Sequence, residues 1–297
     1  MNTNTPIHLH MLLGTYPSTE AMLNGTVRSD LIELDFAKVP RASNAFKRVV
    51  RDMEFDIAEL AIITFLLAKA HGKPLVLLPA VIVGRYQHPY IVYNAERGVL
   101  SPRDLNGKRI GLRSYSVTTA TWVRGILQQD FDLDLSTVQW TTFEEPHVSE
   151  FVDPVNVKRA PADKDLVQML LDGEIDAAIV GDGAKQDPRI KTLFPDPDAE
   201  AMAWKSRHQA IQINHMVVAK KSLLQTRPDV VREVFGMLQE SRRIALDQGG
   251  NPGPEFGLEA NRSNIEVAID YCYDQKLIDR RMSVDELFDD TTRLLGA

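Results

Sequence analysis

The sequence predicts an α/β fold of two similar lobes with a ligand cleft between them. The first observation behind this prediction is a repeat. Residues 52–58 read DMEFDIA and residues 172–178 read DGEIDAA, so four of seven positions agree at a distance of 120 residues. Each copy follows an amphipathic helical pattern and runs into a short apolar strand. A unit repeated once at this distance indicates two lobes, and clefts between lobes bind small ligands and exclude water.

The second observation is that strand and helix patterns alternate along most of the chain. Strands are expected at residues 7–13, 31–36, 55–59, 75–83, 109–112, 138–142, 175–180 and 211–219. Helices are expected between them at 19–24, 42–53, 61–71, 118–129 and 163–172, and in the last third at 229–247, 265–276 and 284–295. Such alternation predicts mainly parallel sheets flanked by helices.

Composition narrows the class of protein. The 297 residues are enough for two domains with a substantial core. A formal net charge of −7, without a basic run carrying interleaved aromatic residues, argues against a nucleic-acid partner. No apolar run approaches the about 18 residues that span a membrane, and the first residues lack the pattern of a signal peptide. We therefore expect a cytoplasmic protein without a membrane partner; a homo-oligomer is compatible with the sequence.

A candidate anion site follows the strand expected at residues 109–112. A polar loop leads there into the helix at 118–129, so free backbone N–H groups and the positive end of the helix dipole face an anion. Ser116, Thr118 and Thr119 add hydroxyl donors. Ordinary helix capping accounts for the same residues, and the pattern alone leaves both interpretations open.

Family motifs begin at residues 104–112, DLNGKRIGL, which resemble the entry to the second lobe of the type 2 periplasmic-binding-protein fold. Within that group the chain resembles the 4,5-dihydroxyphthalate decarboxylase family. The resemblance is carried by RYQH at 85–88, IVYN at 91–94, GVLSP at 98–102, TTATWVRGIL at 118–127, MLLDGEIDA at 169–177, LFPD at 193–196 and IQINHMVV at 211–218. The segment FEEPH at 143–147 departs from the family by replacing a glycine-rich turn, and its His147 is expected in solvent.

The resemblance implies a topology in which the chain crosses between the lobes twice. The first lobe is then discontinuous, at residues 1–88 plus 206–297, and the second lobe is residues 89–205. The crossovers are expected near 89–93 and 205–212. No pair of histidines has the spacing of a metalloprotease and no Cys/His cluster exists, so neither a metal site nor a cofactor is expected.

The function implied by the resemblance is cofactor-independent decarboxylation of a hydroxylated aromatic (di)carboxylate such as 4,5-dihydroxyphthalate. Direct loss of CO₂ would leave an aryl carbanion of prohibitive energy, so the ring must be protonated at the carboxylate-bearing carbon while a ring hydroxyl supplies electrons. This chemistry needs an acid near the carbon and a base near the hydroxyl, roles that suit histidine. Two alternatives remain: a solute-binding protein for a small anion, and another cytosolic lyase on the same fold, of the menaquinone-pathway type.

Acid–base candidates are two histidines and two carboxylates. The resemblance places His88 and His215 at the two crossovers, where either is a proton carrier or a structural histidine. Glu59 is expected at the end of a strand and the start of the next helix, as a base or polar anchor in the cleft or as a helix N-terminal acid. Asp182 holds the corresponding place in the second lobe, where it is also expected to contact the substrate.

Candidates for binding the substrate are arginines and one tyrosine. A planar guanidinium matches a carboxylate better than an ammonium group does. Arg85, Arg113 and Arg124 are expected near strand or helix ends that face the cleft, although a surface ion pair accounts equally well for Arg124. Tyr115 offers a ring that stacks on an aromatic substrate or simply packs in the core.

Overall fold

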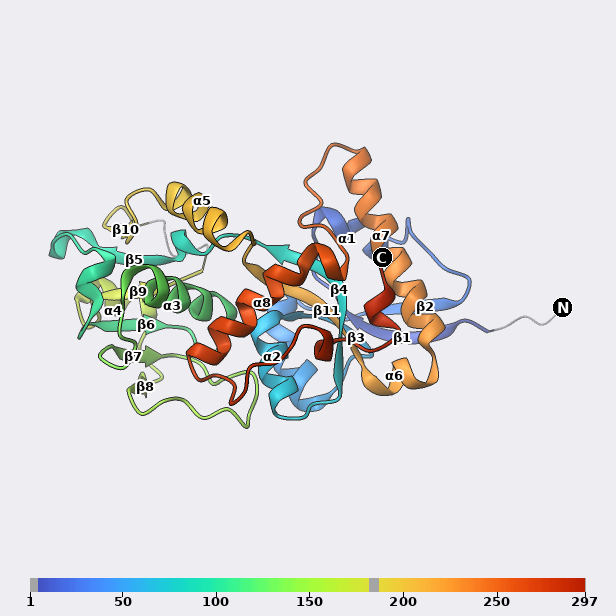
Figure 1. Cartoon of the computed structure of the whole chain (residues 1–297), viewed down its shortest axis with the longest axis horizontal. Helices are drawn as coiled ribbons and strands as arrows, with labels where there is room; N and C mark the ends of the chain where they lie inside the picture. The colour runs from blue at the N-terminus through green and yellow to red at the C-terminus, as the bar shows by residue number, and fades with distance from the viewer. Residues whose placement is uncertain (1–4, 182–186, 297) are drawn as a thin grey trace.

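The computed structural model describes residues 5–181 and 187–296, which form two lobes, each with its own β-sheet (Figure 1). The first sheet has the order β2-β1-β3-β11-β4 and the second the order β10-β5-β9-β6-β7-β8. The crossover strands β5 and β11 run antiparallel to their neighbours, and the other described pairs are parallel. The predicted two-lobed α/β fold is confirmed.

The chain builds most of the first sheet, enters the second lobe and then returns. The first sheet contains β1 (Ile7–Leu12), β2 (Ile32–Phe36), β3 (Ile57–Ala61), β4 (Leu75–Gly84) and β11 (Ile213–Lys220). The second contains β5 (Ile91–Asn94), β6 (Arg109–Leu112), β7 (Gln139–Thr142), β8 (Val157–Arg159), β9 (Ala177–Ile179) and β10 (Ile190–Thr192). The chain therefore leaves the first sheet after β4 and rejoins it with β11. The division at residues 88/89 and 205/206 stays a prediction.

The repeated sequence element has the same structural role in both lobes. β3 lies between parallel β1 and antiparallel β11, just as β9 lies between parallel β6 and antiparallel β5. The aspartate before each strand, Asp56 or Asp176, accepts a hydrogen bond from the backbone N–H of the neighbouring strand, at His10 (3.0 Å) or Arg109 (2.9 Å). The same aspartates return a backbone N–H to those residues. Each aspartate thus sets the register of its strand.

Side chains alternate between the two faces of a sheet, so apolar side chains on each face need to be covered, and helices cover them. The helices are α1 (Pro17–Leu23), α2 (Ile62–Ala70), α3 (Thr118–Phe131), α4 (Leu166–Asp172), α5 (Pro197–His208), α6 (Lys221–Thr226), α7 (Pro228–Asp247) and α8 (Leu258–Asp274). In β1, Leu9 and Met11 join the apolar cluster under α1 and α7, whereas Leu12 joins the cluster under α2 and α8. That second cluster continues into the other lobe.

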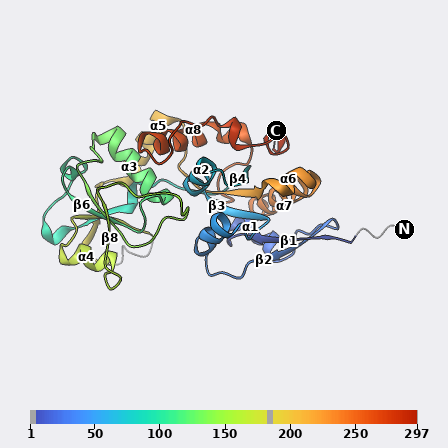
Figure 2. The same cartoon turned by 90° about the horizontal axis from the view of Figure 1, so that it is seen from below.

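Helix α8 ties the lobes together, packing against both α2 and α3 (Figures 1 and 2). Its Tyr271 hydroxyl accepts a hydrogen bond from the indole N–H of Trp204 in α5, at 2.9 Å. Trp122 of α3 donates to the carbonyl of Ile213 in β11, at 2.8 Å. The second lobe is thereby anchored both to the C-terminal segment and to the returning crossover strand.

Two local predictions are wrong, and a third element is helical as predicted but of another helix type. Glu59 lies within β3, opposite Val217 of β11, and does not begin a helix. The helix expected at residues 284–295 is two 3₁₀ turns, Asp285–Leu287 and Thr292–Leu294, because Asp289 caps the second turn by accepting from the backbone of residues 291 and 292. The helix expected at 42–53 begins as a 3₁₀ turn, Ala42–Ala45, and ends as a π-helix, Arg48–Asp52. In addition, α5, α6, β8 and β10 are absent from the prediction.

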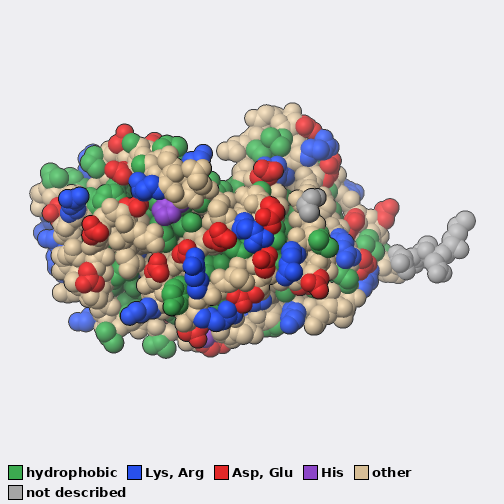
Figure 3. Space-filling model, in the orientation of Figure 1, with side chains coloured by type: hydrophobic (Ala, Val, Ile, Leu, Met, Phe, Trp, Pro, Cys, Tyr) green, Lys and Arg blue, Asp and Glu red, His purple; other side chains and the backbone are tan. Residues whose placement is uncertain are grey.

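Two kinds of feature are absent from the described part of the chain. None of its helices is long and apolar enough to cross a membrane. It contains no group of three or more His, Cys, Asp or Glu side chains arranged to hold a metal ion. On the face shown in Figure 3, acidic and basic side chains are interspersed, without an extended region of one sign.

Candidate active site

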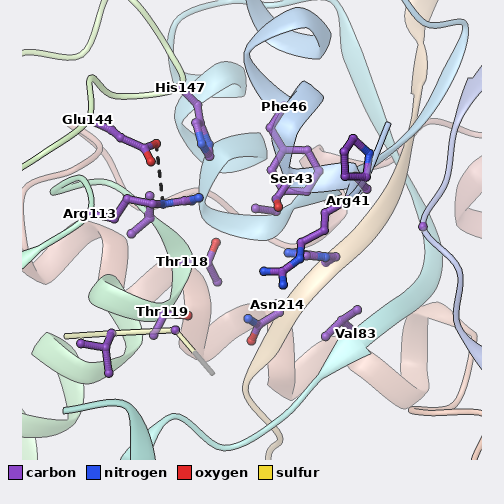
Figure 4. Close-up of a pocket in the computed structure, with 18 of the residues that line it drawn as sticks. Arg41, Ser43, Phe46, Val83, Arg113, Thr118, Thr119, Glu144, His147 and Asn214 are labelled. Atoms are coloured by element: carbon purple, nitrogen blue, oxygen red, sulfur yellow. Dashed lines mark ion pairs between the residues drawn. The ribbon is translucent and has the colours of Figure 1, made fainter. Parts of the chain in front are cut away.

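A pocket of about 970 Å³ lies between the lobes. Residues at or just beyond the carboxyl ends of β1, β3, β6, β7 and β9 line it, and this is the edge at which open α/β sheets bind ligands. Its volume is in the range of pockets that take small organic molecules. Figure 4 shows that Arg41 and Asn214 from the first lobe and Arg113 and Thr118 from the second point into the same space.

A buried hydrogen-bond network centres on Glu59, whose side chain has no exposed surface. The Nδ1 atom of His215 lies 2.6 Å from its Oε1, and the Tyr16 hydroxyl donates to the same oxygen at 2.8 Å. The backbone N–H of Gly14 donates to Oε2 at 2.7 Å. Burial, and then the Glu59 carboxylate, raise the pKa of Tyr16, so its hydroxyl keeps its proton. Three donors thus hold a carboxylate that has no contact with water.

His215 connects this network to the pocket. Glu59 on β3 is paired with Val217 of the adjacent β11, so His215 lies two residues away on the same face of the sheet. Its side chain is 18% exposed, lines the pocket, and packs edge-on against the ring of Phe46 with centroids 5.1 Å apart. Because Glu59 engages Nδ1, the Nε2 edge of the imidazole is the one left to meet a ligand. The prediction that His215 reaches the cleft agrees with this geometry.

A second histidine, His147, lines the pocket from the segment after β7. It is buried, packs edge-on against Phe46 at 5.8 Å, and its Nδ1 lies 2.8 Å from the hydroxyl of Thr64 in α2. Burial, reinforced by the nearby Arg113, lowers the pKa of His147 to about 3, so the ring is neutral at neutral pH. The expectation that His147 lies in solvent is wrong, because the first lobe covers a segment that looks polar and loop-like in sequence.

Arginines from both lobes line the pocket. Arg113, directly after β6, pairs with Glu144 at 3.8 Å, as Figure 4 shows. Arg85, directly after β4, places its guanidinium 4.3 Å from the ring centroid of Tyr90. Arg41, from the loop before the Ala42–Ala45 turn, also points inward (Figure 4). Arg41 is not among the site residues predicted from the sequence, because the loop after β2 carries no motif.

The start of α3 faces the pocket, as the anion-site prediction requires. Thr118 and Thr119 both line the cavity, and the Thr118 hydroxyl is buried without a hydrogen-bond partner among the described residues. The structure does not bring Ser116 or Tyr115 to the pocket wall, since both are buried in the turn that precedes the helix. Only part of the predicted hydroxyl cluster is therefore available to a ligand.

The comparisons with known proteins agree with the motifs. A family model described as "NMT1/THI5 like" matches residues 32–153. The chain is 28% identical over 253 residues to a 4,5-dihydroxyphthalate decarboxylase of Comamonas testosteroni, covering 81% of this chain and 76% of the relative. It is 30% identical over 211 residues to a protein of the same name from Pseudomonas putida, covering 67% of this chain and 81% of the relative. The chain belongs to the 4,5-dihydroxyphthalate decarboxylase family.

The fold of this family member is also found in a periplasmic binding protein. The periplasmic aliphatic sulphonate binding protein SsuA from Escherichia coli superposes with a TM-score of 0.62, covering 95% of this chain and 97% of that one. The predicted periplasmic-binding-protein-like fold is thereby confirmed. At 13% sequence identity this likeness shows the fold alone.

The family motifs divide between the pocket and the core. Of RYQH, Arg85 lines the pocket, whereas His88 does not. His88 is buried and packs edge-on against Phe194, with ring centroids 5.5 Å apart. Burial lowers the pKa of His88 to about 4. Of WVRG, Arg124 is fully buried and donates to Gln275 Oε1 at 2.9 Å, so it is neither a pocket residue nor part of a surface ion pair. Asp182 lies outside the described residues.

His88 and Arg124 stay out of the pocket for identifiable reasons. In the first crossover, the backbone N–H of Gln87 donates to Gln212 Oε1 at 2.5 Å and its side-chain amide donates to Asn214 Oδ1. Asn214 lines the cavity, whereas the ring of His88 packs against Phe194. Arg124 lies more than one turn inside α3, where it donates to the Tyr115 carbonyl at 2.8 Å and lies 3.8 Å from the Tyr115 ring centroid.

Proposed function

We propose that this chain is a cofactor-independent carboxy-lyase that removes CO₂ from a hydroxylated aromatic dicarboxylate such as 4,5-dihydroxyphthalate. The observation that carries the proposal is the Glu59–His215 pair, a proton carrier held by a buried carboxylate at the wall of an arginine-lined pocket. The names of the curated relatives support the same reaction.

The chemistry assigned to His215 is proton transfer to carbon. Its imidazolium gives the Nε2 proton to the ring carbon that bears the leaving carboxylate, while the ring oxygen para to that carbon supplies electrons. The bond to the carboxylate carbon then breaks, its electron pair restores the aromatic ring, and CO₂ leaves. One proton is consumed for each CO₂ released. Glu59 holds Nδ1–H and stabilises the imidazolium, as the carboxylate does in a catalytic triad.

The cations account for the two carboxylates of the substrate. Arg113, Thr118 and the N–H groups at the start of α3 offer donors for one carboxylate from the second lobe. Arg41 and Arg85 offer planar guanidinium groups from the first lobe. A dianion bound by both lobes holds them together over the reacting carbon, and the exclusion of water favours loss of charge from the leaving carboxylate.

A second function, binding of an anionic solute, is favoured by the fold shared with SsuA and by the anion donors at the start of α3. Binding alone does not require a histidine held by a buried carboxylate. The two functions therefore differ in one measurable respect, which is whether the bound aromatic acid loses CO₂.

The test is incubation of the purified protein with 4,5-dihydroxyphthalate, following CO₂ release and the formation of 3,4-dihydroxybenzoate by chromatography. We expect one deuterium at the vacated ring carbon when the reaction runs in D₂O. His215→Gln should lower kcat by about 10²–10⁴ with little change in KM. Arg41→Ala should raise KM by about 10-fold or more, because it removes a charge-assisted hydrogen bond.

Two controls make the result specific. Phthalate, which lacks the hydroxyl groups, should bind but release no CO₂. His71→Gln makes the same change at an exposed histidine that caps α2 outside the pocket, and it should leave kcat unchanged. Binding of hydroxylated aromatic acids without CO₂ release from any of them would refute the proposal and favour solute binding.

A further inference from the structure

His147 enters the pocket from the second lobe but is held in place by the first. Arg51, in the Arg48–Asp52 π-helix, donates to the carbonyls of His147 at 2.9 Å and Pro146 at 2.7 Å. Thr64 of α2 fixes the imidazole through Nδ1. Because both the backbone and the ring have partners in the first lobe, the Nε2 edge of His147 has a defined position at the junction of the lobes.

The two pocket histidines have opposite electrostatic surroundings. His215 has an acidic partner, since its Nδ1 lies 2.6 Å from the Glu59 carboxylate. His147 is buried and has Arg113, Lys47, Arg51 and His215 around it, all of which oppose a positive charge. His147 is therefore a neutral hydrogen-bonding group in the same pocket as the proposed proton carrier.

A neutral imidazole bonded to a hydroxyl suits one kind of ligand group. If Thr64 donates to Nδ1, then Nε2 carries a hydrogen and donates; if Nδ1 donates to Thr64, then Nε2 accepts. A phenolic hydroxyl donates and accepts, so it matches either arrangement. A carboxylate only accepts, and charged arginines bind it more strongly than a neutral ring does.

The position of His147 also fits a substrate held at His215. Phe46 packs edge-on against both imidazoles, with centroid distances of 5.8 Å to His147 and 5.1 Å to His215. Figure 4 shows His147 and Phe46 side by side at the pocket wall. One aromatic ring lying against Phe46 is thus within reach of both histidines.

We propose that His147 binds a ring hydroxyl of the substrate and so selects hydroxylated over unsubstituted aromatic carboxylates. This inference rests on the proposed function and names the residue that recognises its substrate class. Phe143, Glu144 and His147 all line the pocket, so the 143–147 segment, which departs from the family pattern, contributes directly to specificity.

The test measures binding of two ligands that differ only in their hydroxyl groups, 3,4-dihydroxybenzoate and benzoate. Neither is the proposed substrate, so calorimetry gives Kd without turnover. Wild type should bind 3,4-dihydroxybenzoate more tightly. His147→Phe keeps an aromatic ring without hydrogen-bonding atoms, and it should reduce the ratio of the two Kd values by about 10-fold, the effect of losing one buried hydrogen bond. Benzoate affinity should change less than about threefold.

Further variants separate recognition from structure. His147→Gln keeps a neutral donor and acceptor and should restore part of the preference. Thr64→Val removes the anchor of the imidazole and should reduce the preference to a smaller degree, which also tests the inference if His147→Phe fails to fold. His71→Phe, at the exposed C-cap of α2, is the matched control and should keep the wild-type ratio.

Each outcome decides the inference. An unchanged Kd ratio in His147→Phe, an equal weakening of both ligands, or no preference in wild type would overturn it. A ratio that falls in His147→Phe while Thr64→Val lies between it and wild type would support it. If no CO₂ is released from 4,5-dihydroxyphthalate but the ratio still falls in His147→Phe, the proposed reaction fails and hydroxyl recognition stands.

Discussion

Replacing Glu59 by glutamine changes the proton chemistry of His215 while nearly preserving shape. Glu59 accepts three hydrogen bonds, from Gly14 N–H at 2.7 Å, the Tyr16 hydroxyl at 2.8 Å and His215 Nδ1 at 2.6 Å. A glutamine has a single acceptor oxygen at its amide. The Gly14 N–H cannot rotate, so the oxygen must take the Oε2 position and the NH₂ group must face Tyr16 and His215.

This orientation satisfies the network only if its hydrogen atoms reverse. The Tyr16 hydroxyl rotates to accept, and His215 changes tautomer so that Nδ1 accepts and Nε2 carries the hydrogen. In this tautomer His215 cannot become an imidazolium without placing two donors face to face. We expect the Glu59→Gln protein to fold, with a loss of about 1–2 kcal/mol from exchanging charged for neutral hydrogen bonds. Its kcat should fall by about 10²–10⁴, the magnitude associated with a misdirected tautomer or a lost general acid.

The assay is steady-state CO₂ release from 4,5-dihydroxyphthalate, together with urea unfolding. KM should stay within about threefold, because Glu59 has no surface in the pocket. Glu33→Gln is a matched control: Glu33 lies 3.4 Å from His8 on the neighbouring strand of the same sheet, but that pair is exposed and outside the pocket. Retention of kcat within threefold by Glu59→Gln would refute the assignment of His215 as a carboxylate-held proton donor.

Two further predictions concern Arg124, which is buried outside the pocket, and the two buried histidines His147 and His88. Arg124→Met should lower the free energy of unfolding by about 3 kcal/mol, because it leaves Gln275 Oε1 and the Tyr115 carbonyl without their charged donor. The KM of the variant should not change. A raised KM with unchanged urea unfolding would instead identify Arg124 as a substrate ligand. Acidification should destabilise the fold, since burial lowers the pKa of His147 to about 3 and of His88 to about 4 while the unfolded chain binds these protons near pH 6.5. The free energy of unfolding thus falls as the pH drops below about 6.5, by at most about 2 kcal/mol for each histidine at pH 5. His147→Gln or His88→Gln should each reduce the difference between the free energies of urea unfolding at pH 7 and pH 5. A pH sensitivity identical to wild type in both variants would contradict this account.

The candidate site was only partly predictable, because the sequence indicates which loops meet but not which way their side chains turn. The anion site at the start of α3 follows from local order alone, and Thr118 and Thr119 line the pocket as expected. Ser116, in the same hydroxyl run, is buried in the preceding turn. His88 and Arg85 are three residues apart in one motif, yet only Arg85 lines the pocket.

The sequence by itself determined the two-lobed fold and the family. The repeat can be recognised in the sequence because Asp56 and Asp176 make the same hydrogen bonds to the neighbouring strand. These bonds depend on only a few adjacent residues in each lobe. Alternation of strands and helices similarly reflects the local periodicity of apolar side chains.

Only the tertiary structure decided which groups meet in the pocket. Glu59 and His215 are separated by 156 residues and become neighbours through the pairing of β3 with β11. His147 is polar and loop-borne in sequence, and it becomes a buried, neutral ring because Thr64 and Arg51 of the other lobe close over its segment. Strand register and lobe packing depend on the sum of many distant contacts, so no local pattern records them.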